Sequence, residues 1–87
     1  MDELSWRAKL ARLNINITNV DLEHNILFYD FSYRPFSGAS PKWVKTTTTP
    51  VMDTYQAINH DQLVVDWEAT TDKLRDEVLS LRKELEG

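Results

Sequence analysis

The residues best suited to chemistry in this chain are its two histidines. His24 stands close to Asp21 and Glu23, and His60 precedes Asp61. An imidazole near carboxylates can ligate a metal ion or transfer a proton. The spacing around His24 matches no metal-site pattern, however, and a solvated polar turn explains it. A position at the start of a helix explains the surroundings of His60, because Asp61 is a good N-cap residue.

Other common catalytic and cofactor motifs are also missing from the sequence. It has no cysteine, which excludes disulfides and thiolate zinc sites. Its only glycines are Gly38 and Gly87, which excludes a glycine-rich phosphate loop. We therefore expect no catalytic residue, no cofactor and no metal ion, and we do not expect an enzyme.

Charge is unevenly distributed along the chain. The net charge is −4, and the excess lies in residues 61–87, which carry eight acidic and four basic residues. An acidic segment repels a phosphate backbone, so nucleic acid is not the expected main partner. No apolar run approaches the roughly 20 residues that span a bilayer, and the N-terminus lacks the apolar core of a signal peptide. We expect a soluble intracellular protein, cytoplasmic or nuclear, without membrane contact.

Residues 1–60 predict a small α+β head. Trp6, Leu10 and Leu13 recur with helical spacing, and alternating apolar and polar residues then follow with the period of a strand. The expected elements are a helix over 2–13 and strands over 14–20, 26–34 and 42–49, with a loop containing glycine and proline between the last two. We expect an antiparallel β-meander of two or three strands with the helix packed on one face, since two strands alone are barely stable in water.

One face of the strand over 26–34 is strongly aromatic. Its members are Leu27, Tyr29, Phe31 and Tyr33. With the basic residues Arg34, Lys42 and Lys45, this face resembles a stacking platform for single-stranded nucleic acid, which is the alternative function. We favour its use as the core of the head, because a head of this size needs that apolar surface for its own packing.

The last third of the chain carries a heptad pattern. The apolar positions, here called the heptad seam, are separated by alternating steps of three and four residues, and are Val64, Trp67, Thr71, Leu74, Val78, Leu81 and Leu85. Valine at position a with leucine at d favours two parallel strands. Glu77 of one helix would then pair with Arg82 of the other. Residues 61–87 therefore predict a long C-terminal helix that forms a parallel dimeric coiled coil.

Three other arrangements satisfy the same pattern. The helix could fold back on its own sheet as a single amphipathic helix, pair antiparallel with a second copy, or pair with a different protein. The heptads continue to Leu85, two positions from the last residue. We therefore expect the chain to be a fragment of a longer protein, with residues 61–87 as the start of a longer rod.

Together these features predict a structural or adaptor protein. The helix would join two copies of the chain, and the paired heads would present two copies of one surface to a protein partner. Phe36 and Trp43 flank the loop between two strands and are the candidate partner-binding residues. Ser40 and Thr49 precede prolines and are candidate phosphorylation sites. The threonine run that ends at Thr49 also suggests an edge strand open to pairing with a partner segment.

Overall fold

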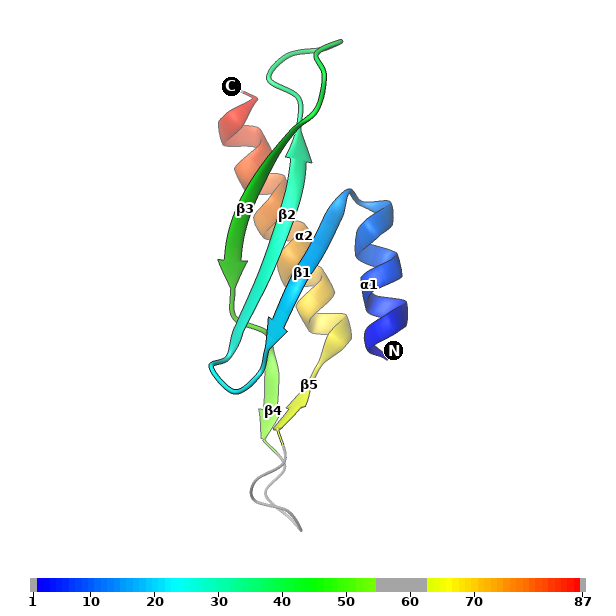
Figure 1. Ribbon diagram of the computed structural model, residues 1–87, viewed down its shortest axis with the longest axis vertical. Helices are drawn as coiled ribbons and strands as arrows, with labels where there is room; N and C mark the ends of the chain where they lie inside the picture. Colours follow the sequence, from blue (N-terminus) through cyan, green and yellow to red (C-terminus); the bar gives the residue numbers. More distant parts are fainter. Residues whose placement is uncertain (1, 55–62, 87) are drawn as a thin grey trace.

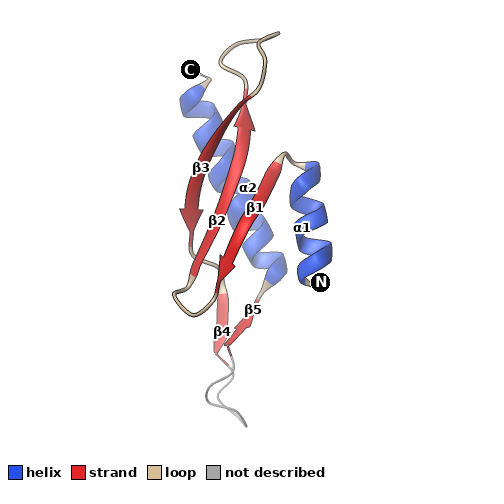
Figure 2. Cartoon of the chain, viewed as in Figure 1, coloured by secondary structure: helices blue, strands red, loops and turns tan. Residues whose placement is uncertain are grey.

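Two helices lie on one face of a three-stranded antiparallel sheet in the computed structural model, which describes residues 2–54 and 63–86 (Figures 1 and 2). The elements follow one another as α1 (Glu3–Arg12), β1 (Ile15–Asp21), β2 (Ile26–Tyr33), β3 (Lys42–Thr48), β4 (Met52–Thr54), β5 (Leu63–Val65) and α2 (Trp67–Leu85). The predicted α+β architecture, with an N-terminal helix, a three-stranded meander and a C-terminal helix, is confirmed.

Local sequence explains where α1 begins and ends. The Asp2 carboxylate accepts a hydrogen bond of 2.7 Å from the Ser5 backbone N–H, which caps the first turn. Trp6 and Leu10, one turn apart, are buried against the sheet. Asn14 then takes a φ of 58°, a left-handed conformation that asparagine tolerates and that ends helices. The chain turns there directly into β1, so α1 packs beside the strand that follows it (Figure 1).

The central strand β2 supplies most of the sheet's contribution to the core. Its alternate residues Leu27, Tyr29 and Phe31 are almost completely inaccessible to solvent. Ile15 and Ile17 of β1 extend this surface. The predicted inward face of the strand is therefore confirmed as core for these three residues of β2, whereas Tyr33, its fourth member, is only half-buried. The aromatic platform considered for nucleic acid is therefore not available at the surface, because two of its three rings, Tyr29 and Phe31, are buried.

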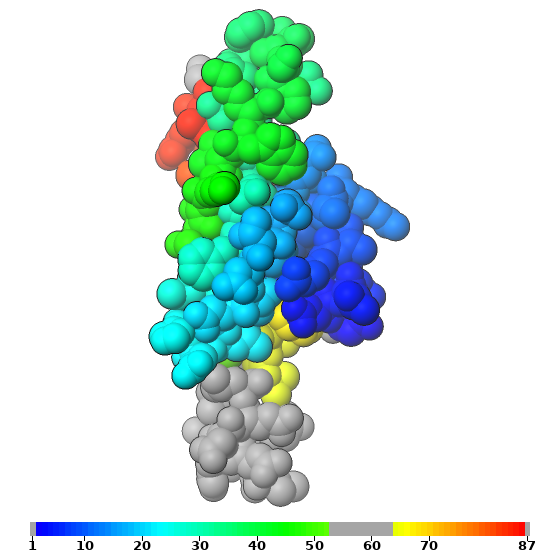
Figure 3. Space-filling model, in the orientation of Figure 1, coloured from blue at the N-terminus to red at the C-terminus, as the bar shows by residue number. Residues whose placement is uncertain are grey.

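The opposite face of the sheet is not covered by a helix in the described part of the chain. The part of this face formed by β2 and β3 carries Phe28, Asp30 and the buried Ser32 from β2, and Trp43, Lys45 and Thr47 from β3. We call these six residues the open face. Figure 3 views the molecule from this side, where the strands lie at the surface. Sheets of this kind commonly pack one face on the core and leave the other free.

The C-terminal helix begins later than the sequence predicts. Residues Leu63–Val65 form the short strand β5, which pairs antiparallel with β4, so the assignment of Val64 to a helical seam is wrong. The helix starts at Trp67 after Asp66, whose carboxylate accepts a 3.0 Å bond from the Ala69 N–H. His60 and the first predicted turn, residues 61 and 62, lie outside the described residues.

Helix α2 packs on the sheet of its own chain. Thr71, Leu74 and Val78 are buried, and the last two belong to the same core cluster as the apolar residues of β2. The Trp67 ring lies 4.4 Å from that of Trp6, centroid to centroid, and so joins α2 to α1. The fold-back arrangement is therefore the one seen within a single chain. Neither described helix has the length and apolar character needed to cross a membrane.

Candidate partner-binding groove

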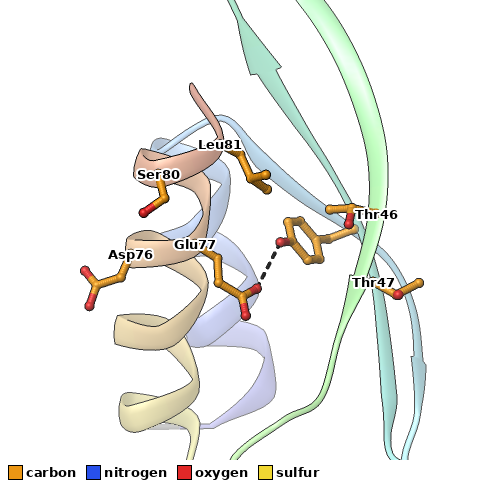
Figure 4. Close-up of a pocket in the computed structure, with 7 residues that line it drawn as sticks. Thr46, Thr47, Asp76, Glu77, Ser80 and Leu81 are labelled. Atoms are coloured by element: carbon orange, nitrogen blue, oxygen red, sulfur yellow. Dashed lines mark hydrogen bonds between the residues drawn. The ribbon is translucent and has the colours of Figure 1, made fainter. Parts of the chain in front are cut away.

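A groove of about 480 Å³ runs between β3 and α2. Its lining combines the sheet and the helix, and consists of Tyr29, Thr46, Thr47, Asp76, Glu77, Ser80 and Leu81. Figure 4 shows the helix residues on one side and the two threonines of β3 on the other. We call this feature the β3–α2 groove.

The floor of the groove is held by a hydrogen-bond network that joins β2, β3 and α2. The Tyr29 hydroxyl donates to Glu77 Oε2 at 3.2 Å, the bond dashed in Figure 4. The Thr48 hydroxyl donates to Glu77 Oε1 at 3.0 Å. Burial raises the pKa of the Tyr29 hydroxyl, and the charge and hydrogen bond of Glu77 raise it further. Tyr29 therefore remains a neutral donor, and the Glu77 carboxylate links α2 to both β2 and β3 beside the groove.

The raised pKa of Tyr29 predicts a loss of stability at high pH. The folded chain holds this proton more tightly than the unfolded chain, so the free energy of unfolding falls once pH exceeds about 10, the ordinary pKa of tyrosine. We expect the wild type to lose up to about 1.4 kcal/mol per pH unit more than Tyr29→Phe in that range. Urea unfolding at several alkaline pH values measures both slopes. Tyr33→Phe is the control and should keep the steeper wild-type slope.

The groove follows a free edge of the sheet. Among the described elements β3 pairs only with β2, so its other edge presents unpaired backbone groups. Thr46 and Thr47 point to opposite faces of the sheet, yet both line the groove. The backbone edge between them therefore faces the groove. The edge strand expected from the threonine run is present at this position.

The predicted ion-pair residues of the coiled coil are both engaged within the chain. Glu77 accepts the two bonds described above. Arg82 Nε donates to the carbonyl of Ser32 at 2.8 Å, and its Nη2 donates to the carbonyl of Leu13 at 2.9 Å. Arg82 thus ties α2 to the end of β2 and to the C-terminus of α1, where a cation also complements the helix dipole. Other heptad positions differ: Trp67 and Leu81 are half-buried at the edge of the core, and Leu85 is exposed.

The candidate binding and phosphorylation residues lie at the surface. Phe36 and Trp43 are 69% and 55% exposed. Trp43 belongs to the open face, whereas Phe36 lies in the loop between β2 and β3, beside a hollow that Arg34 also lines. Ser40 and Thr49 are both exposed, and the hydroxyl of Thr49 accepts a 2.8 Å bond from Lys73 Nζ. Their phosphorylation stays a prediction.

The histidine nearest to carboxylates lies in a turn, as the sequence suggests. His24 Nδ1 is 2.9 Å from Asp21 Oδ2, at the exposed turn between β1 and β2. The hydrogen bonds of Asp21 with the His24 side chain and with the His24 backbone N–H lower the pKa of Asp21. Within residues 2–54 and 63–86, no three histidine, cysteine or acidic side chains come together as a metal site would require.

Comparison with protein-family models, curated proteins and solved structures finds no match to this chain. Its function must be argued from geometry. The β3–α2 groove was not predicted from the sequence, because the Tyr29–Glu77 contact joins residues 48 positions apart. The one available signal was the β-branched strand 42–49, which indicated the edge but not the helix beside it.

Proposed function

We propose that this chain is a non-catalytic interaction protein that binds an extended segment of a partner protein in the β3–α2 groove. The observation that carries this proposal is the free backbone edge of β3 facing a groove whose far wall is a helix. An extended segment placed there would pair with β3 as a fourth strand. Main-chain hydrogen bonds would give affinity, and alternate side chains would give specificity.

Charge in the groove favours a basic partner segment. Asp76 and Glu77 form part of the α2 wall, and the described lining contains no basic residue. A bound strand would send every second side chain toward that wall. Lysine or arginine at alternating positions therefore complements the groove, whereas acidic residues at those positions would be repelled.

A pair of model peptides tests this proposal. We expect a fluorescein-labelled heptapeptide of alternating valine and lysine to bind at least about tenfold more tightly than its valine–glutamate counterpart. Fluorescence anisotropy at about 0.15 M salt measures both affinities. Ser80→Trp should abolish binding, because Ser80 is exposed and lines the groove, so a large ring there occupies the space of the peptide.

Two aspartates of α2 provide a matched control. Asp72 and Asp76 are both exposed and both lie close to Arg75, at 3.3 and 3.7 Å, but only Asp76 lines the groove. Asp76→Lys should weaken binding of the basic peptide about 3- to 10-fold, and Asp72→Lys by less than about twofold. Equal effects of the two reversals, or full binding by Ser80→Trp, would rule the groove out as the binding site.

Association of two copies through a parallel coiled coil stays a prediction, as does the intracellular location. The coiled coil and the fold-back helix use the same side chains, since Leu74 and Val78 cannot pack on the sheet and on a second helix at once. A paired helix would have to leave the sheet and expose the core face of β2. Two associated copies, however they join, would present two grooves and so bind a bivalent partner with higher avidity.

A further inference from the structure

The centre of the open face holds a carboxylate oxygen without a hydrogen-bond partner. Asp30 Oδ1 is inaccessible to solvent and bonds to no group among the described residues. It lines a hollow of about 230 Å³ together with Phe28, Lys45 and Thr47. Lys45, directly opposite on β3, forms no ion pair in the part of the chain described. A buried acceptor without a donor costs about 1–3 kcal/mol, so this site is suited to receive one.

The register of β2 and β3 arranges the open face in three successive rows. Each row pairs unlike side chains: Ser32 with Trp43, Asp30 with Lys45, and Phe28 with Thr47. The first row places a small residue beside a large one, the second an acid beside a base, and the third a large residue beside a small one. Each row therefore contains two side chains that complement each other in size or in charge.

We infer that the open face binds a second copy of this chain. A two-fold axis parallel to the strands and midway between β2 and β3 exchanges the two members of each row. Lys45 of each copy then lies over the Asp30 carboxylate of the other, and a rotation of the Asp30 side chain brings its buried oxygen to that ammonium group. Trp43 packs over Ser32, and Phe28 packs over Thr47, so large side chains meet small ones across the interface.

The size of the open face sets the expected strength of this association. The two strands of the open face, with about seven residues each, present roughly 200 Å² in each copy. This is well below the total of about 1,200 Å² at which stable interfaces begin. The dimer should therefore be weak and depend on concentration, with Trp43 as the main apolar contact because it is 55% exposed in one chain.

Sedimentation equilibrium of charge variants tests the arrangement. The wild-type mass should rise from one chain toward two between about 10 μM and about 1 mM. Asp30→Lys or Lys45→Asp alone should lower the association constant at least about tenfold, because each reversal places like charges together twice in the dimer. An equimolar mixture of these two variants should associate again, since a face with two bases meets a face with two acids. Bonds within one chain cannot produce that recovery.

Lys42→Asp is the matched control, because Lys42 belongs to the same strand but alternates to the helix side of the sheet. It should associate as the wild type does, and circular dichroism establishes that each variant is folded. A wild-type chain that stays monomeric at 1 mM overturns the inference. So does association that survives Asp30→Lys, which places the contact elsewhere, including the heptad seam. Salt-sensitive binding of a single-stranded oligothymidine by a chain that stays monomeric would assign the open face to nucleic acid instead.

Discussion

Replacing Leu74 by alanine should lower the free energy of unfolding by about 2–5 kcal/mol. Leu74 is fully buried midway along α2, within the core cluster that includes Leu27 and Phe31. Removing its three outer carbons loses their burial and leaves a cavity between helix and sheet. A domain of this size is stable by roughly 5–15 kcal/mol in total, so the loss is a large fraction of it. Urea unfolding followed by circular dichroism measures the difference.

The same substitution at Leu79 provides the control. Leu79 lies on the same helix and is 55% exposed, so Leu79→Ala should change the free energy of unfolding by no more than about 0.5 kcal/mol. The two variants remove the same atoms from the same helix and differ only in the environment of the side chain. Equal losses would contradict the position of α2 on the sheet.

Much of the head could be predicted because its signals are local. Helical spacing of Trp6 and Leu10 marks α1, and strict alternation along residues 26–33 marks β2 and its inward face. Short connections then leave few topologies, since a turn with Asn25 at a φ of 57° brings β2 back along β1. An antiparallel meander follows from these features without knowledge of distant contacts.

The start of α2 could not be predicted for a physical reason. Leu63, Val64 and Val65 are apolar in succession and continue the helical pattern that follows them, so they resemble a widened stripe. Their strand conformation depends on pairing with β4, which lies about ten positions earlier in the chain. Asp66 was the only local sign of the boundary, because its carboxylate caps the helix.

The heptad pattern illustrates a limit of periodicity. Spacing of three and four residues defines a narrow apolar stripe but does not say what covers it. The apolar face of the sheet determines what packs on this stripe. Leu27, Tyr29 and Phe31 must be shielded from water, and α1, with only two buried residues, is too small to shield them all. The groove was hidden for the same reason, because it exists only once α2 lies beside β3.

Two arginines distinguish the fold-back arrangement of α2 from the coiled coil, because the two arrangements give them different surroundings. Arg75 and Arg82 each follow a leucine at heptad position d, Leu74 and Leu81, and therefore both occupy position e. A symmetric coiled coil places the two arginines in similar surroundings. In the single chain they differ. Arg82 donates to two backbone carbonyls, whereas Arg75 lies at the surface near Asp72 and Asp76.

We therefore expect Arg82→Met to lower the free energy of unfolding by about 1.5–3 kcal/mol, because charged donors are lost and two carbonyls are left without them. Arg75→Met should cost about 0–1 kcal/mol, as for other exposed ion pairs. Methionine keeps most of the apolar stem in both variants, so the comparison isolates the guanidinium. Urea unfolding at low micromolar concentration, where the weak open-face dimer is dissociated, gives both values. Similar losses at the two positions, together with an unfolding midpoint that rises with chain concentration, would favour the coiled coil over the fold-back helix.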